Sequence, residues 1–325
     1  MVQIPEQIYR SAQAARPRGG AVDVVTIAAL SKALGIRPGQ TTNCRVCQVA
    51  GRYDQTALSF GIGQNGQPVL FCHRDGCSFQ DQLAALGFHG TKAIAKPTER
   101  ERQEYDEMRA AQERVRALKV QRLWDEARQL TEGDPAWLYL EKRGIDPREA
   151  TGHGLACHYG LWCPEIGATS PALLSRFQPV SGGSWGGAIR TWIDHTGAKI
   201  DRRWLGACSA QIVVCKSSGP NLVIGEGVET VLAYATLAAR HNHRTAGYSA
   251  LAAGSSTNLG NLRLPKGWGR HLLIAADNDD AGLTAAHKLR ATARNAGWDA
   301  CIDTPITRKT DFNDQLRTVL NKAGQ

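Results

Sequence analysis

The sequence lacks three features that would each define a class of protein. It contains no run of about 18 apolar residues, so it predicts no membrane-spanning helix and no membrane partner. It contains no Gly-x-x-x-x-Gly-Lys-Ser/Thr loop, which excludes a P-loop motor within these residues. Its first residues lack the basic and then apolar segments of a signal peptide, and we therefore expect a cytoplasmic protein.

Acidic residues are in the minority. The formal net charge is +9 and the sequence pI is near 9.2. Such an excess suits a polyanionic partner, usually nucleic acid, although a merely basic protein is an equal alternative. The 325 residues suffice for about two domains. The nine cysteines are odd in number, which favours reduced thiols or metal ligands over a disulfide framework.

Four of these cysteines form two close pairs on either side of a predicted β hairpin. Two apolar stretches, residues 57–62 and 68–71, are separated by a Gly- and Asn-rich turn and predict that hairpin. Cysteine pairs on a β ribbon are typical of tetrahedral, structural zinc sites. His73 is an alternative fourth ligand, because it adjoins the second pair. The expected zinc ligands are Cys44, Cys47, Cys72 and Cys77.

Zinc would fold this module, and the ribbon face would also contact nucleic acid through charge and stacking. The residues for that contact are Arg45, Arg52, Tyr53 and Arg74. The remaining cysteines show no metal spacing and are interpreted as ordinary thiols. They are Cys157, Cys163, Cys208, Cys215 and Cys301.

Four regions follow one another along the chain. We assign residues 1–95 to the zinc-binding domain and the charged stretch 96–144 to a helical linker. Residues 145–220 contain short β-like pieces and a predicted hairpin. From residue 221 to 325, apolar strands alternate with helices, which predicts a mostly parallel sheet.

Two predicted strands end in acidic residues. Glu226 lies between two glycines after the first strand, and Asp277 and Asp279 follow a later one. Ligands of parallel α/β sheets gather beyond the carboxyl ends of strands, and crowded carboxylates suit Mg²⁺. The segment Asp277-Asn-Asp-Asp280 has an alternative interpretation as a helix N-cap. The second acidic strand end favours a metal site over that alternative.

These motifs resemble the Toprim domain. The resemblance rests on Gly-Glu-Gly at 225–227, Asp-Asn-Asp-Asp-Ala-Gly at 277–282 and Lys-Thr-Asp-Phe-Asn-Asp at 309–314. With the zinc ribbon, the order is similar to that in the Toprim primases of phages, plasmids and other mobile elements, relatives of bacterial replicative primases. The implied fold is an α/β Toprim core, a parallel-type sheet between helices, with an N-terminal α+β subdomain and a β-ribbon zinc-binding domain before it.

The resemblance also implies roles for individual acids. Glu226, Asp277 and Asp279 would bind catalytic Mg²⁺ or Mn²⁺, and Asp311 is the matching later acid. Asp314 is the second choice for that later acid, since it would otherwise cap the next helix. We expect Glu229 to face the helix surface and Asp280 to be a bystander.

A basic segment precedes the Toprim part, where the resembling primases carry a ridge for template and triphosphates. The candidates are Arg190, Lys199, Arg202 and Arg203. Trp192 and Trp204 lie among them and would offer stacking faces. An equal alternative is that the Trp side chains are core and the charges a solvated face. Lys216 and Lys309 are weaker candidates for triphosphate contact.

The function implied is that of a DNA primase, which makes short RNA primers on single-stranded DNA from NTPs by Mg²⁺-dependent nucleotidyl transfer. Without a P-loop motor in the chain, a separate helicase would unwind the template. The alternatives are a Toprim nuclease or topoisomerase-like enzyme, and a non-catalytic zinc-bearing module that binds single-stranded DNA. The zinc ribbon and basic hairpin favour the primase.

Overall fold

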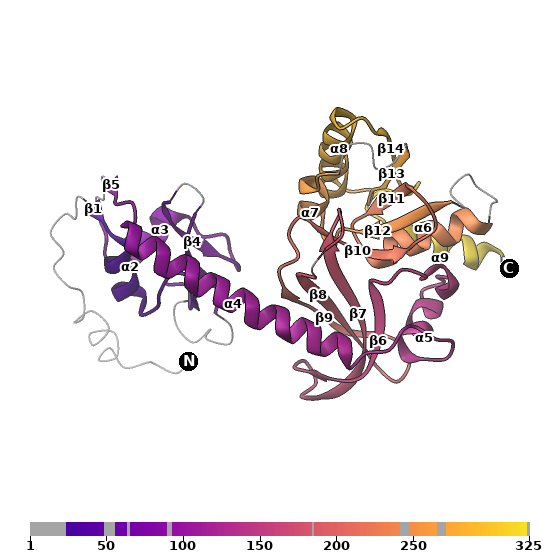
Figure 1. Cartoon of the computed structure of the whole chain (residues 1–325), viewed down its shortest axis with the longest axis horizontal. Helices are drawn as coiled ribbons and strands as arrows, with labels where there is room; N and C mark the ends of the chain where they lie inside the picture. The colour runs from indigo at the N-terminus through magenta and orange to yellow at the C-terminus, as the bar shows by residue number, and fades with distance from the viewer. Residues whose placement is uncertain are drawn as a thin grey trace, which may run out of the picture. The chain divides into compact units, whose positions relative to one another are not determined.

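The computed structural model describes residues 24–48, 56–63, 66–89, 93–183, 185–240, 247–264 and 271–323. The chain divides into two compact units, Met1–Gln112 and Glu113–Gln325. Within the described residues, none of the helices combines the length and the apolar character needed to cross a membrane. Figure 1 labels most of the elements of the two units.

The N-terminal unit is built around a small antiparallel sheet. Strands β2 (Thr41–Thr42), β3 (Leu58–Ile62) and β4 (Pro68–Cys72) pair in that order, and β3 and β4 form the predicted hairpin. Helices α2 (Ile27–Leu34) and α3 (Phe79–Ala85) cover it, and β1 (Val24–Val25) pairs with β5 (Ala93–Ile94). The apolar core is small, so a bound metal would add to the stability of this unit.

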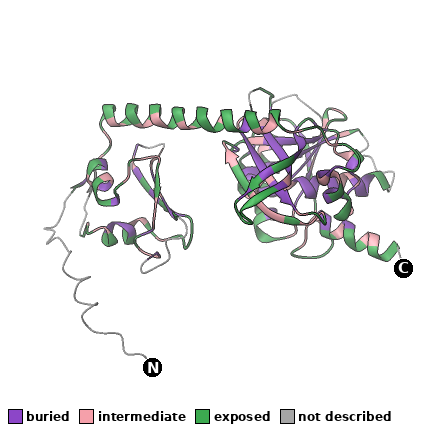
Figure 2. Ribbon diagram, turned by 90° about the horizontal axis from the view of Figure 1, so that it is seen from below, coloured by how far each residue is buried: buried purple, intermediate pink, exposed green. Residues whose placement is uncertain are grey.

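Helix α4 (Glu99–Asp125) is strongly charged and exposed along most of its length (Figure 2). Val120 is its one fully buried residue. Helix α5 (Pro135–Lys142) follows, and Asp134 caps it by accepting a hydrogen bond from the Trp137 N–H at 2.7 Å. A short 3₁₀ turn, Pro147–Glu149, leads into the sheet of the second unit.

One nine-stranded sheet forms the centre of the C-terminal unit. Its antiparallel part comprises β6 (Leu155–Cys163), β7 (Ala168–Pro179), β8 (Gly187–Ile193), β9 (Lys199–Gly206) and β10 (Gln211–Lys216). Its parallel part comprises β11 (Asn221–Gly225), β12 (Tyr248–Ala252), β13 (His271–Ala275) and β14 (Asp299–Asp303). The order is β14-β13-β11-β12-β10-β7-β8-β9, with β6 paired to β7.

Helices cover both faces of the parallel part. Helices α6 (Val228–Arg240) and α9 (Phe312–Ala323) pack with α5 over one apolar core. Helices α7 (Ser256–Asn261) and α8 (Asp280–Asn295) pack over the other. Figure 1 shows these two pairs on opposite sides of the strands. The predicted fold class, a parallel-type sheet between helices joined to an α+β part, is confirmed.

The strand register positions the acidic loops. Gly225 on β11 pairs with Ala275 on β13 in parallel. The chain leaves both strands at the same edge of the sheet, so Glu226 and Asp277 emerge from neighbouring strand ends.

Candidate metal centres

The four predicted zinc ligands converge in the N-terminal unit. The sulfur atoms of Cys44, Cys47, Cys72 and Cys77 all lie within 4.8 Å of one another. The Cys44–Cys77 and Cys47–Cys72 sulfur separations are 3.8 and 3.6 Å. A tetrahedral zinc with Zn–S bonds of about 2.3 Å requires sulfur separations of about 3.8 Å. The donor set and its spacing therefore fit structural Zn²⁺.

Neighbouring groups prepare two of these sulfurs for metal binding. Burial tends to raise the pKa of Cys72, but the backbone N–H groups of residues 74, 75 and 77 lower it to about 6. The pKa of Cys44 is also lowered, because hydrogen bonds from Cys47 and Gln82 outweigh its burial. Gln82 Nε2 lies 2.8 Å from the Cys44 sulfur and is fully buried on α3. Sequence reasoning missed Gln82, since an amide on a short helix carries no metal-binding pattern.

Other candidates in this unit have different surroundings. His73 lies outside the four-sulfur cluster and its Nε2 contacts Ser59 Oγ. Arg45 and Arg74 are exposed, as the predicted nucleic-acid contact requires. Arg52 and Tyr53 lie outside the described residues.

The second group of candidates is the cluster of acids at the sheet edge. The pKa of Asp277 rises to about 7, because burial and then the charges of Glu226, Asp311 and Asp279 all disfavour its ionised form. Burial and Asp279 raise the pKa of Glu226 in the same way. Asp277 therefore lies within electrostatic reach of the other three acids. Among the described residues, only the four cysteines bring three or more ligand atoms within 4.8 Å of one another, so the acids are more widely spaced than the sulfurs. Oxygen donors that repel one another suit a divalent cation such as Mg²⁺.

Backbone contacts bring Asp311 to this edge although it lies on a distant loop. The Asn278 backbone donates to the Thr310 carbonyl at 3.0 Å and accepts from the Lys309 N–H at 2.7 Å. Burial raises the pKa of Asp311, as does the charge of Asp314. Asp311 Oδ1 also accepts from the Asp314 N–H at 2.8 Å, so it caps the start of α9.

Asp279 has the capping role that the alternative interpretation assigned to its tetrapeptide. Its Oδ1 accepts from the Gly282 N–H at 2.7 Å at the start of α8. A Cβ on Gly282 would lie 2.5 Å from the Asp277 carbonyl oxygen, so only glycine lets the helix begin this close to that residue. A carboxylate has two oxygens, and the cap uses one of them. Capping and metal binding by Asp279 are compatible.

The expectation that Glu229 faces the helix surface is wrong. Glu229 is only 6% exposed and accepts a hydrogen bond from Tyr139 Oη at 2.6 Å. It also forms an ion pair with Arg202. Its orientation follows from these two partners, which lie far away in sequence. Asp280, by contrast, is exposed and pairs with Arg308 at 2.7 Å.

The predicted basic residues divide between the two faces of the β8–β9 hairpin. Arg190 and Arg203 are cross-strand partners, whereas Arg202 is opposite Thr191 and its side chain reaches Glu229. Arg203 pairs with Asp201 at 2.6 Å, and Lys199 is exposed. They do not form one continuous ridge.

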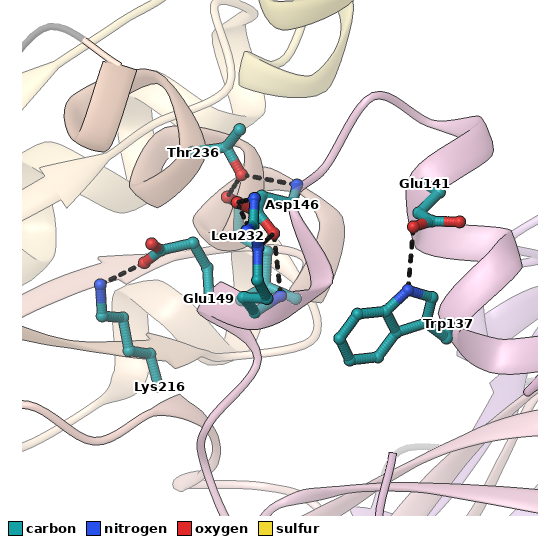
Figure 3. Close-up of polar contacts among 8 residues, drawn as sticks. Trp137, Glu141, Asp146, Glu149, Lys216, Leu232 and Thr236 are labelled. Atoms are coloured by element: carbon teal, nitrogen blue, oxygen red, sulfur yellow. Dashed lines mark hydrogen bonds and ion pairs between the residues drawn. The ribbon is translucent and has the colours of Figure 1, made fainter. Parts of the chain in front are cut away.

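The aromatic and weaker basic candidates also differ among themselves. Trp192 is fully buried in the core, whereas Trp204 is 43% exposed beside Phe177. Lys216 forms an ion pair with Glu149, and Figure 3 shows the two side chains meeting end to end. Lys309 is exposed.

Arg143 is a charged residue near the acids that sequence reasoning missed. Its charge partly offsets the burial that raises the pKa of Asp311, and it adds to the larger effects of Arg202 and Tyr139 that lower the pKa of Glu229. Its guanidinium carbon lies 5.4 Å from the centre of the Tyr139 ring, and its Nε is buried without a hydrogen-bond partner. A basic residue at the end of a helix is ordinarily explained by the helix dipole, so its sequence position gave no signal.

Family comparisons match two segments of the chain. Residues 221–322 match the family model described as a Toprim domain. Residues 114–214 match a second model, described as a domain of unknown function (DUF7146). Among the curated proteins, none matched the chain significantly.

The chain is also similar to solved structures of primases. The primase fragment of the bacteriophage T7 primase-helicase protein is 12% identical, with a TM-score of 0.35, over 56% of this chain and 72% of that chain. A DNA primase domain from Pseudomonas aeruginosa is 13% identical, with a TM-score of 0.35, over 59% and 71%. The Aquifex aeolicus primase, with its zinc-binding and RNA polymerase domains, is 14% identical, with a TM-score of 0.33, over 85% and 76%. Similarities of this strength do not assign an activity.

The family match and the observed topology agree on the C-terminal region. The four parallel strands and their covering helices lie within the matched residues. The described N-terminal residues contain a β ribbon with the four-sulfur cluster. The chain therefore contains a Toprim domain at residues 221–322, preceded by a β-ribbon module whose tetracysteine cluster fits zinc.

Proposed function

We propose that the protein is a DNA primase, which synthesises short RNA primers on single-stranded DNA from NTPs. The observation that carries this proposal is the pair of half-buried acids Glu226 and Asp277 at the ends of β11 and β13, with Asp279 exposed beside them, within the Toprim domain. Such a group binds a divalent cation, and divalent cations serve phosphoryl transfer. The tetracysteine ribbon supports a primase over a Toprim nuclease, which needs no triphosphate or template module.

In the proposed reaction, a 3′-hydroxyl oxygen bonds to the α-phosphorus of an incoming NTP. The bond between that phosphorus and the bridging oxygen breaks, pyrophosphate leaves, and the hydroxyl loses its proton. Glu226, Asp277, Asp279 and Asp311 would hold Mg²⁺ or Mn²⁺. The bound cation supplies charge neutralisation for the triphosphate and acidifies the hydroxyl. Glu226 is either a metal ligand or the proton acceptor.

The chain's cations would orient the anionic substrates. Arg143 would add positive charge near Asp311. Lys199, Arg190 and Arg203 would contact the template or the triphosphate from the β8–β9 hairpin. The exposed Arg45 and Arg74 would contact single-stranded DNA from the zinc ribbon.

Each of the four regions along the chain has its own proposed role. Residues 1–95 would bind zinc and template, 96–144 would link, 145–220 would present template and NTPs, and 221–325 would hold the catalytic cation. A separate replicative helicase would supply single-stranded template, and the reaction would take place in the cytoplasm.

Primer synthesis tests the proposal directly. Purified protein is incubated with single-stranded DNA, Mg²⁺ and labelled ribonucleotides, beside the Asp277→Ala and Asp280→Ala variants. We expect short RNA products from the wild type and from Asp280→Ala, because Asp280 is exposed and outside the acidic cluster. We expect products to fall at least about a hundredfold in Asp277→Ala, since removing a metal ligand or its charge costs several powers of ten in phosphoryl transfer.

The contrary outcomes are distinct. Absence of RNA products from the wild type sinks the primase proposal. Loss of the input DNA that depends on Asp277 would identify a nuclease instead. DNA binding with neither product formation nor DNA loss would identify a non-catalytic binding module.

A further inference from the structure

Glu229 joins three elements at the first turn of α6. Its carboxylate accepts from Tyr139 Oη on α5 at 2.6 Å and from the guanidinium of Arg202 on β9. Arg202 is held in turn by Thr191, whose Oγ1 lies 3.3 Å from its Nε. We call Tyr139, Arg202 and Glu229 the Glu229 triad. It ties the antiparallel hairpin and α5 to the Toprim helix through one buried carboxylate.

The turn that carries Glu229 also touches the acidic cluster. Glu226 precedes it by three residues, and the Glu226 carbonyl accepts from the Gly254 N–H at 2.6 Å. The next residue after Glu229, Thr230, donates from its hydroxyl to Asp277 Oδ1 at 3.4 Å. A shift or rotation of this turn would therefore move Glu226 and the partner of Asp277 together.

A small cavity leaves room for such a shift. It borders the triad and is lined by Thr191, Gly227 and Gly254 among others. Gly227 directly follows Glu226, and the Gly254 N–H donates to the Glu226 carbonyl. Removing one partner of a buried ion pair leaves an uncompensated charge that must move or take up water. The cavity is lined by Arg202 and Glu229 themselves and offers space for that rearrangement.

We propose that Glu229 is a positioning residue of the Toprim metal centre. Its contacts with Tyr139 and Arg202 fix the first turn of α6. That turn holds Glu226 and Asp277 in position to bind one divalent cation. The inference rests on the proposed function, because that function requires this metal centre. It also reassigns Arg202 from a contact with substrate to a contact within the protein.

Manganese affinity tests the proposal independently of activity. Mn²⁺ binding to the full chain is followed by the electron paramagnetic resonance of the free ion, at a temperature well below the unfolding midpoint. We expect Glu229→Gln to weaken Asp277-dependent Mn²⁺ binding about tenfold or more, as removal of outer contacts of metal ligands does elsewhere. Tyr139→Phe removes one hydroxyl and keeps the ring, and we expect a smaller loss in the same direction.

Glu149→Gln is the matched control. It breaks the ion pair between Glu149 and Lys216 in the same unit (Figure 3). The side chains of Glu149 and Lys216 are 16% and 15% exposed. We expect Glu149→Gln to lower thermal stability, as Glu229→Gln does, while leaving Mn²⁺ affinity unchanged. Tyr139→Phe keeps the test informative if Glu229→Gln does not fold, which near-ultraviolet circular dichroism reveals.

Two results would overturn the proposal, and they are separable. If Tyr139→Phe and Glu229→Gln bind Mn²⁺ within about twofold of Glu149→Gln, the triad is only structural and the proposed function stands. If the wild type has no Mn²⁺ site that Asp277→Ala removes, the metal centre itself is absent, and both proposals fail.

Discussion

At the scale of single residues, Asp277 is an acid placed where its own charge is disfavoured. Burial and three neighbouring carboxylates raise its pKa to about 7. Its folded-state pKa therefore lies above the unfolded value, and the metal-free chain loses stability as pH rises from about 4 towards 7. Above that range the loss is complete. This loss of stability is characteristic of a site that is built to bind a positively charged ligand.

Replacing this acid should therefore stabilise the metal-free protein. We expect Asp277→Asn to raise the free energy of unfolding at pH 8 by on the order of 2 kcal/mol in the presence of a chelator, and to make little difference at pH 4. Urea unfolding at the two pH values measures this. Asp280→Asn is the control, because that carboxylate is exposed. A gain of the same size at pH 4 would contradict the electrostatic explanation.

Sequence reasoning found the acids and missed their partners for a physical reason. Glu226 and Asp277 end apolar strands, and the convergence of parallel strand ends is a rule of the fold. The orientation of Glu229 depends on Arg202 and Tyr139, which are 27 and 90 residues away. No local periodicity encodes such a contact. The same holds for Gln82, which reaches Cys44 from 38 residues away.

At the scale of elements, an arginine sandwiched between two indole rings holds the end of α4 against the sheet. The guanidinium of Arg176 on β7 lies 3.5 Å from the ring centre of Trp185 and 4.1 Å from that of Trp124 on α4. Arg176 is 8% exposed, and burial lowers its pKa to about 10. A planar cation between two aromatic faces is stabilised by stacking and cation–π contact, and here the charge of Asp125 also favours the charged form.

We expect Arg176→Lys to destabilise the C-terminal unit by about 1–2 kcal/mol, because an ammonium cannot stack on two rings. Chemical unfolding followed by tryptophan fluorescence measures this change. Arg122→Lys, at an exposed position in the last turn of α4, should cost less than about 0.5 kcal/mol. Equal effects of the two substitutions would show that the stacking is energetically unimportant.

Elements were predicted best where the pattern was simple. The apolar strands β11 and β13 and the charged helix α4 match their sequence interpretations closely. The 12-residue strand β7 showed only as short β-like pieces, because most of its residues are buried on both faces and therefore do not alternate. Its pairing with three neighbours explains that burial.

At the scale of the whole molecule, the chain comprises two units with different sources of stability. The described N-terminal core is small and is accompanied by the tetracysteine cluster, whereas the C-terminal unit has two extensive apolar cores. A small core of this kind relies on its metal to remain folded. Zinc should therefore control the folding of the first unit alone.

Calorimetry of the full chain checks this expectation. We expect two transitions, of which a strong zinc chelator removes or markedly lowers one and leaves the other unchanged. Cys44→Ser should reproduce the effect of the chelator, and Cys301→Ser, an exposed cysteine outside the cluster, should not. A single transition that shifts as a whole on chelation would show that the two units unfold together.

The sheet of the C-terminal unit runs without interruption across residue 220. Strand β10 pairs with β12 on one side and with β7 on the other, and Val213 lies opposite Ala252. A fragment that begins at residue 221 would lack β10 and leave the edge of β12 with unpaired N–H and C=O groups. The Toprim segment should therefore fold poorly when it is separated from residues 113–220, which belong to the same compact unit.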